Sequence, residues 1–183
     1  MDTRIIIGFA IISEDGMLAD AGGLMPDSLK IAADQRFFEQ GLDGVDVVVH
    51  GKNSHEHQPH SHLRRRLIVT RKVPALEPDA AEQKAWLWNP AGASLHQALS
   101  AVGMPDARLG VLGGTDVFGM FLGQYDIFHL SRAHGVRLPG GRPVFPQVPA
   151  QSPEQVLASH GMEPCPPVFA DKELEIVTWR RAP

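Results

Sequence analysis

The pattern of hydrophobic and polar positions along this chain predicts an α/β fold. Nearly continuous apolar runs, typical of buried strands, occupy residues 5–13, 46–51, 66–70 and 108–112, and a further strand-like run occupies 125–131. Helices are expected between them at about 28–40, 94–102 and 115–122. Strands that alternate with helices indicate a mostly parallel central sheet with helices on both faces.

Capping residues and glycines mark the ends of these elements. Ser28 is expected to cap the first helix and Gly41 to stop it. Residues 17–26 and 138–146 contain Gly and Pro and are expected to form loops, while residues 85–88 form a short strand. The C-terminal residues 173–179 alternate between apolar and polar, which predicts an antiparallel strand at the edge of the sheet.

Composition narrows the class of protein. A length of 183 residues fits a single domain over 1–183, and the net charge of −4 gives no broad positive field that would attract nucleic acid. The single cysteine, Cys165, excludes an intrachain disulfide. The N-terminal apolar run is too short to span a membrane and lacks a signal-peptide pattern. We therefore expect a cytoplasmic protein with no membrane partner.

Two expected strand ends carry glycine. Gly51 and Lys52 follow one strand, and Gly113 and Gly114 follow another. Glycine lets backbone N–H groups approach a phosphate closely, and the positive end of a following helix favours an anion. Both corners would lie at the carboxyl ends of the strands, where open α/β sheets bind ligands. The alternative for a Gly-Gly pair is tight packing between strand and helix.

Several segments are found together in one known family. They are Asp15-Gly16, Gly51-Lys52, RLIVT (66–70), GVLGGTDVFGMFL (110–122), YDIFHLS (125–131) and GGRPVFP (140–146). The chain resembles the dihydrofolate reductase-like superfamily, above all the reductase domain of the bifunctional deaminase–reductase of riboflavin biosynthesis. The resemblance implies that fold, NADPH as cofactor, and hydride transfer to a small heterocyclic or ribosylamino-pyrimidine substrate. A pterin reductase of the dihydrofolate reductase type is the alternative activity.

The resemblance also implies which residues bind the cofactor. They are Ala10, Gly51, Lys52, Asn53, Ser54, Thr70, Arg71, Leu112, Gly113, Gly114, Thr115, Asp116, Val117 and Phe118. Lys52 and Arg71 would pair with the 2′-phosphate that distinguishes NADPH from NADH, since lysine and arginine both bind phosphate. The alternative for Arg71 is a solvated strand end.

Four residues are implied in substrate binding: Ile11, Asp34, Phe38 and Ser131. Reduction of a C=N or C=O bond requires a proton as well as a hydride, and Asp34 is the candidate acid. Ile31 and Phe38 lie three and four positions away, so Asp34 could border the buried face of its helix, where burial would raise its pKa. The alternative is a solvent-facing helix carboxylate. Residues 17–25, with Gly22 and Gly23, match a loop that closes over the site in this family.

Some positions depart from the family pattern. Asp27 stands where an aromatic residue is usual, Ser54-His55 replaces Thr-Trp, and Thr115 replaces a third glycine. The segment His50–His62 holds five histidines, which could bind a metal but which we interpret as a polar loop without metal. A non-catalytic ligand- or metal-binding domain is therefore the alternative to a reductase. A homodimer formed through the C-terminal strand is also expected.

Overall fold

The computed structural model describes residues 4–52 and 60–183, and its core is a ten-stranded sheet with the order β10-β12-β8-β1-β7-β3-β4-β6-β5, in which β11 also pairs with β12. Six strands run parallel: β1 (Ile5–Ile12), β3 (Val47–Gly51), β4 (Arg65–Val69), β6 (Ala85–Trp88), β7 (Arg108–Val111) and β8 (Ile127–Ala133). Antiparallel pairing adds β5 (Leu76–Pro78), β10 (Met162–Pro164), β11 (Phe169–Ala170) and β12 (Leu174–Arg181). The predicted mixed α/β class is confirmed.

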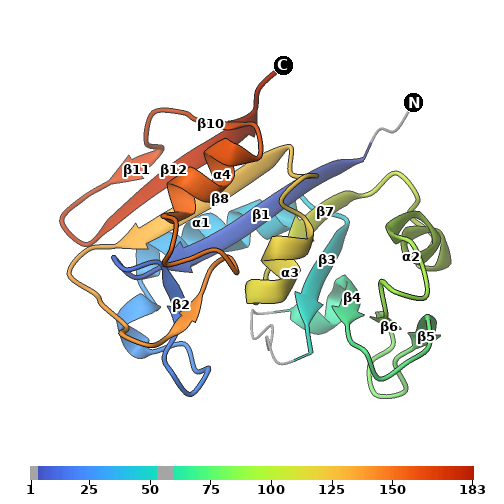
Figure 1. The fold of residues 1–183 in the computed structure, drawn as a ribbon. Coiled ribbons are helices and arrows are strands. Elements are labelled where there is room, and N and C mark those ends of the chain that lie inside the picture. The colour runs from blue at the N-terminus through green and yellow to red at the C-terminus, as the bar shows by residue number, and fades with distance from the viewer. Residues whose placement is uncertain (1–3, 53–59) are drawn as a thin grey trace.

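Helices lie on both faces of this sheet. They are α1 (Ala32–Asp43), α2 (Leu95–Ala101), α3 (Thr115–Met120) and α4 (Pro153–Ser159). Figure 1 shows α3 and α4 in front of the sheet and α1 behind it. Among residues 4–52 and 60–183, no helix has the length and apolar character needed to cross a membrane.

The front face of the sheet is sealed by an aromatic cluster. The Phe128 ring on β8 lies 5.0 Å from the Tyr125 ring, 5.4 Å from Phe145 and 5.6 Å from Phe118, measured between centroids. The buried Tyr125 hydroxyl donates a hydrogen bond to the Phe118 carbonyl at 3.0 Å, so its polar group is satisfied. Gly8 of β1 is required here, because a Cβ would lie 2.2 Å from the Phe128 ring. The cluster holds α3 against the centre of the sheet.

The predicted limits of the first helix were wrong. Ser28 lies in a separate 3-10 turn (Asp27–Leu29), and α1 begins four residues later without a side-chain cap. Gly41 lies inside α1 rather than at its end, and the helix ends at Asp43 with Gly44 as its C-cap. A Cβ on Gly41 would lie 2.4 Å from the Phe9 ring. Glycine is therefore present because α1 packs closely on β1, not because the helix stops there.

The predicted position of the C-terminal strand was also wrong in one respect. β12 is antiparallel to β8 as expected, but β10 and β11 pair with its other side, so it is not an edge strand. A homodimer through an open edge of residues 173–179 loses its structural basis. The Ser152 capping box with Gln155, which begins α4, was present in the sequence but not used in the prediction.

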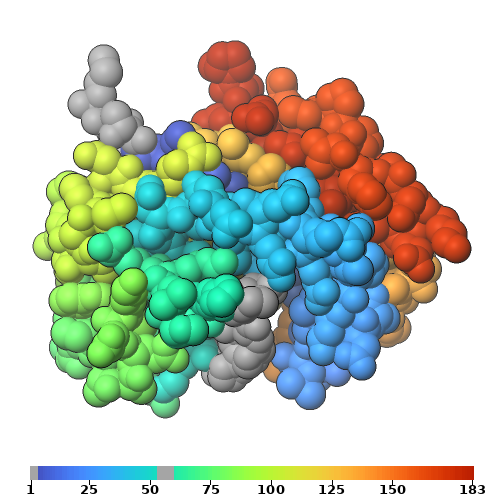
Figure 2. Space-filling model, turned by 180° about the vertical axis from the view of Figure 1, so that it is seen from behind, coloured from blue at the N-terminus to red at the C-terminus, as the bar shows by residue number. Residues whose placement is uncertain are grey.

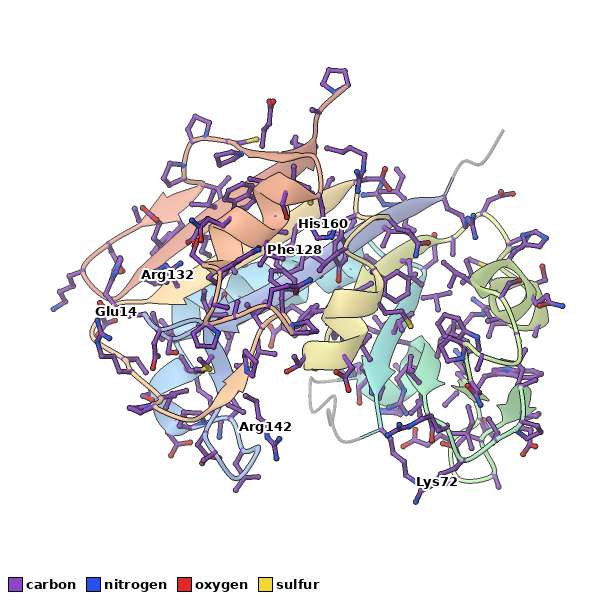
Figure 3. The ribbon with its side chains drawn as sticks, viewed as in Figure 1. Glu14, Lys72, Phe128, Arg132, Arg142 and His160 are labelled. Atoms are coloured by element: carbon purple, nitrogen blue, oxygen red, sulfur yellow. The ribbon has the colours of Figure 1, made fainter. Side chains whose placement is uncertain are left out.

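Part of each predicted loop forms a strand. Residues 17–19 form β2 (Met17–Ala19), which pairs with β9 (Arg142–Pro143) in a small second sheet. The turn before β2 is fixed to β8 and to the segment after it, because Arg132 of β8 donates to the Glu14 carbonyl at 2.9 Å and the Leu138 N–H donates to Asp15. Figure 3 shows Glu14 and Arg132 close together at this corner.

Candidate active site

The parallel strands bring the predicted site residues to one edge of the sheet. β1 lies between β7 and β8, and β3 lies beyond β7, so the carboxyl ends of all four strands are neighbours. Ile11 near the end of β1 is in register with Ser131 on β8. Ala10 and Ile11 are half-buried, whereas most of β1 is buried, so this end of the strand borders the open side of the molecule.

The two glycine corners are in direct contact. The Gly51 N–H donates to the Gly113 carbonyl at 2.8 Å, which joins the end of β3 to the turn after β7. A Cβ on Gly51 would have only ordinary contacts, at 3.6 Å from Val117 and 3.8 Å from the Gly114 nitrogen. A methyl group at Gly51 would therefore fit without a clash. Gly113 has φ +100° and precedes a cis peptide bond to Gly114, and a Cβ there would lie 2.6 Å from the Phe118 ring.

The side chains of residues 115–118 pack around the glycine corner or lie exposed beside it. Val117 and Phe118 were predicted to lie near the cofactor, but their side chains are buried in the core. Thr115 uses its hydroxyl to donate to the Pro143 carbonyl at 2.5 Å, which ties β9 to the corner. Asp116 is exposed, and a carboxylate does not attract phosphate, so any contribution from it comes from the backbone. With only six residues, α3 offers little helix dipole, and the glycine backbone remains the main feature.

Basic side chains gather at the ends of β3 and β4. Contact with Lys72, together with the positive charge of that lysine, lowers the pKa of Lys52. Two ammonium groups held together repel each other, and a bound anion would relieve that repulsion. Figure 3 shows the Lys72 side chain directed into solvent at this edge. Arg71 is exposed beside it, while Thr70 is buried and its hydroxyl accepts from the Lys72 N–H at 3.2 Å.

Asp34 is a buried carboxyl group at the other side of the same edge. Only 9% of the residue is exposed, and burial raises its pKa to about 6, although a hydrogen bond from the Ser131 hydroxyl opposes the rise. A carboxyl group with a pKa of about 6 exchanges a proton near neutral pH, as a general acid must. The alternative expectation, that Asp34 is a solvent-facing helix carboxylate, was wrong, because the residue is buried.

Apolar side chains complete the wall around Asp34. Ile11 lies opposite Ser131 on the neighbouring strand, and Leu29 before α1 is fully buried. Phe38, one turn after Asp34, is half-buried and meets the Phe9 ring edge-on at 5.7 Å. The structure therefore brings together the four residues predicted for the substrate, at the ends of β1 and β8 and on α1.

His129 is a neighbour of this wall that sequence reasoning missed. Its ring lies 5.1 Å from both Phe9 and Phe37, and its Nδ1 lies 2.9 Å from the Thr178 hydroxyl. Burial, and then the charge of Arg180, lower its pKa to about 4, so it is neutral at physiological pH. The sequence did contain a signal, because His129 precedes Ser131 by two residues and therefore shares its face of the strand.

The loop predicted to close over the site carries exposed apolar residues. After β2, Leu24 is 71% exposed and Met25 is 43% exposed. Gly23 has φ +82°, and its N–H donates to the Asp20 carbonyl in a tight turn. Large apolar side chains facing solvent next to a site are suited to covering a ligand.

Part of the predicted site falls outside the described residues. Asn53, Ser54, His55 and His57 lie in the segment 53–59 and are not described. In the described part of the chain, His50 is a buried strand residue, and no three metal-binding side chains gather anywhere.

Two shallow depressions of about 220 Å³ each lie elsewhere on the surface. The first is lined by Trp88, Pro90, Ala93, Ser94, Leu95, Met120, Phe121 and Gln124. The second lies beside α1 and is lined by Ala33, Arg36, Phe37, Gln40, Val168, Phe169 and Ile176. Neither includes Ile11, Asp34 or Gly113.

No protein-family model matches the sequence, and no curated protein matches it. Solved structures do match. A putative riboflavin biosynthesis protein from Shewanella sp. PV-4 is 19% identical with a TM-score of 0.66, over 98% of this chain and 99% of that one. Dihydrofolate reductase from Enterococcus faecalis, in complex with NADP(H) and RAB-propyl, is 16% identical with a TM-score of 0.65. The match covers 99% of this chain and 98% of that one.

A third match is the deaminase/5-amino-6-(5-phosphoribosylamino)uracil reductase from Thermotoga maritima. It is 18% identical with a TM-score of 0.62, and the match covers 98% of this chain but 57% of that larger one. All three proteins are built on the same arrangement of strands and helices, which the chain shares over nearly its whole length. The chain therefore has the dihydrofolate reductase-like fold.

Proposed function

We propose that this protein is an NADPH-dependent reductase of a small heterocyclic substrate. The observation that carries the proposal is the pairing, at one sheet edge, of a glycine corner with a buried, proton-exchanging carboxyl group. The similar solved structures are two reductases and a putative riboflavin biosynthesis protein, and one was solved with NADP(H), which supports the same activity.

The chain offers suitable residues for the cofactor. Gly51 and Gly114 are half-buried, and a Cβ on Gly51 would meet only ordinary contacts, so a phosphate group can approach the backbone at this corner, whereas Gly113 is buried. Lys52 and Lys72, with Arg71 nearby, form a cationic group suited to a 2′-phosphate, which favours NADPH over NADH. When bound, the nicotinamide supplies the hydride, and the protein supplies position and charge.

Asp34 is suited to supply the proton that the reduction requires in addition to the hydride. Its carboxyl group, partly protonated near pH 6, can hold a proton beside the substrate and pass it to a ring nitrogen or carbonyl oxygen. Ionised, it can instead accept hydrogen bonds from N–H groups of a heterocycle. Ser131 orients the carboxyl group, and Ile11 and Phe38 provide apolar walls for a flat ring.

Two classes of substrate fit a site that is lined by a carboxyl group and apolar side chains. A ribosylamino-pyrimidine, as in riboflavin biosynthesis, is our first choice, in line with the riboflavin-related structures among the matches. A pterin is the second, and the observation that favours it is the helix carboxylate Asp34, which the sequence resemblance associates with dihydrofolate reductases. Measuring NADPH oxidation with each compound in turn separates the two.

The sharpest test of the cofactor site is Gly51→Ala. The added methyl group has no close contact within the protein, so the fold should survive, but it occupies the space in front of the corner. We expect the affinity for NADPH, measured by calorimetric titration, to fall about 10-fold or more, because a displaced phosphate loses charge-assisted hydrogen bonds.

Gly123→Ala is the matched control, since a Cβ there has open space around it and the residue follows the C-terminal end of α3, whereas the corner precedes its N-terminal end. It should bind NADPH like the unmodified protein. Equal affinity in the Gly51 and Gly123 variants, or no binding of NADPH by the unmodified protein, would refute the cofactor assignment.

A further inference from the structure

A second concave site lies between α1 and the strands β11 and β12. Its walls are Phe37 and Arg36 of α1, Phe169 of β11 with the preceding Val168, and Ile176 of β12. In Figure 2 the light-blue α1 borders the red C-terminal segment that carries β11 and β12. We call this depression the α1–β12 groove. None of its lining residues has a role in the proposed reduction.

The groove is mostly apolar with one charge. Phe37 and Phe169 are half-buried, Val168 is 54% exposed, and Ile176 forms the buried floor. Arg36 is the single charged residue among those that line it. Within the described residues, no acidic or other hydrogen-bonding group pairs with its guanidinium. An arginine left without an anion beside aromatic rings is a binding arrangement for a carboxylate or phosphate.

Its size sets the scale of the occupant. About 220 Å³ is larger than the roughly 150 Å³ in which benzene is held in an engineered cavity, and it is below the range of about 300–1,000 Å³ for drug-sized ligands. The exposed apolar area is far below the roughly 800 Å² that each partner buries in a stable protein interface, since Val168 is the one large exposed apolar side chain here among the described residues. A small molecule fits the groove better than a second protein does.

We propose that the α1–β12 groove is a second binding site, for a small amphipathic anion with a ring-sized apolar body. The apolar body lies on Phe37, Phe169 and Ile176, and the carboxylate or phosphate pairs with Arg36. The groove is open to solvent, so affinity is in the millimolar range, as expected for a ligand of about ten non-hydrogen atoms.

Two probes of equal size test the charge requirement. Benzoate and neutral benzamide are each titrated into the protein without NADPH, and backbone amide signals are followed by NMR. Benzoate should shift the signals of residues 33–40 and 168–176 with saturation, and benzamide should bind at least 5-fold more weakly. Equal binding of the two probes, or shifts confined to other residues, would overturn the proposal.

Two variants test the location. Arg36→Gln keeps most of the side chain's length and should weaken benzoate binding about 10-fold, while leaving benzamide binding unchanged. Lys172→Gln removes a nearby exposed charge that does not line the groove, and it should leave both affinities unchanged. A loss of benzoate binding equal in both variants would show a general charge effect and refute the Arg36 pairing.

These measurements do not depend on the proposed reductase activity. Gly51→Ala, which should weaken NADPH binding, should leave benzoate binding intact, because the glycine corner and the groove share no residue. Loss of NADPH binding with benzoate binding retained therefore separates the failure of one proposal from the failure of the other.

Discussion

The Ser131 hydroxyl on β8 hydrogen-bonds the carboxyl group of Asp34 on α1, and this contact joins the helix behind the sheet to the strand beside β1. The bond lowers the pKa of Asp34, while burial raises it by more, and the result is a pKa of about 6. The acidity of this group is therefore set by the packing of α1 on the sheet as well as by its own chemistry.

Asp34→Asn should lower turnover by about 100-fold or more, because a general acid typically contributes 10²–10⁴ to rate. If Asp34 donates the proton, the activity of the unmodified protein should fall as pH rises through about 6, where the carboxyl group loses its proton. The rate of NADPH oxidation across pH measures both effects. An unchanged rate and profile in the variant would remove Asp34 from the mechanism.

The same substitution should also stabilise the fold at pH 7. The folded-state pKa of Asp34 is raised from 3.8 to about 6, so the stability linked to its protonation is present below 3.8 and is lost as pH rises through about 6. Removing the buried charge should recover up to about 3 kcal/mol in the free energy of unfolding at pH 7. Urea unfolding of both proteins at pH 4 and pH 7 gives the comparison, and a variant less stable at pH 7 would contradict it.

Ser131→Ala should raise the pKa of Asp34 further, since the bond that favours the ionised form is removed while the burial remains. The midpoint of the pH–rate profile should move to higher pH, and the NMR signal of the Asp34 carboxyl carbon should titrate at higher pH. A midpoint that stays in place or moves down would mean that Ser131 does not act on this carboxyl group. The Ser159→Ala variant, whose hydroxyl lies on α4, is the control.

Lys52→Gln and Lys72→Gln should each weaken NADPH binding about 10-fold and leave NADH binding nearly unchanged, because NADPH alone carries the 2′-phosphate. The affinity for NADPH should also fall as salt is added, as it does for exposed charges. Lys172→Gln, at the turn between β11 and β12, should have no effect on either cofactor. Equal losses for NADPH and NADH would place these lysines elsewhere on the dinucleotide.

The His129→Gln variant should lose less stability than the unmodified protein as the pH falls. The folded-state pKa of His129 is depressed from 6.5 to about 4, so its neutral form stabilises the protein above 6.5, and that stability is lost as pH falls towards 4. Glutamine can keep the hydrogen bond to Thr178 without becoming charged. Over this range the unmodified protein should lose about 3 kcal/mol more than the variant, as measured by urea unfolding. Parallel pH curves for the two proteins would contradict the assignment.

The local pattern of the sequence was sufficient to predict the positions of the parallel strands and of the glycine corners at their ends. Continuous apolar runs identify parallel strands because both faces of each strand are buried, and a glycine after a strand shows where the backbone must turn or lie close to another group. The meeting of Gly51 with Gly113 follows from the parallel order, since the carboxyl ends of neighbouring strands share an edge. The burial of Asp34 agrees with its spacing from Ile31 and Phe38, whereas its role was implied only by the family resemblance and stays a prediction.

Other features were decided only by tertiary structure. Gly41 looks like a helix stop in the sequence, but the approach of Phe9 explains it. The contact of Lys72 with Lys52 was not expected from the sequence, and β12 is covered by β10 and β11. Burial of Asp34 and His129 requires residues from α1, β1, β8 and β12 at once. Local periodicity records which face of an element is apolar, whereas a pKa depends on every element packed around the group.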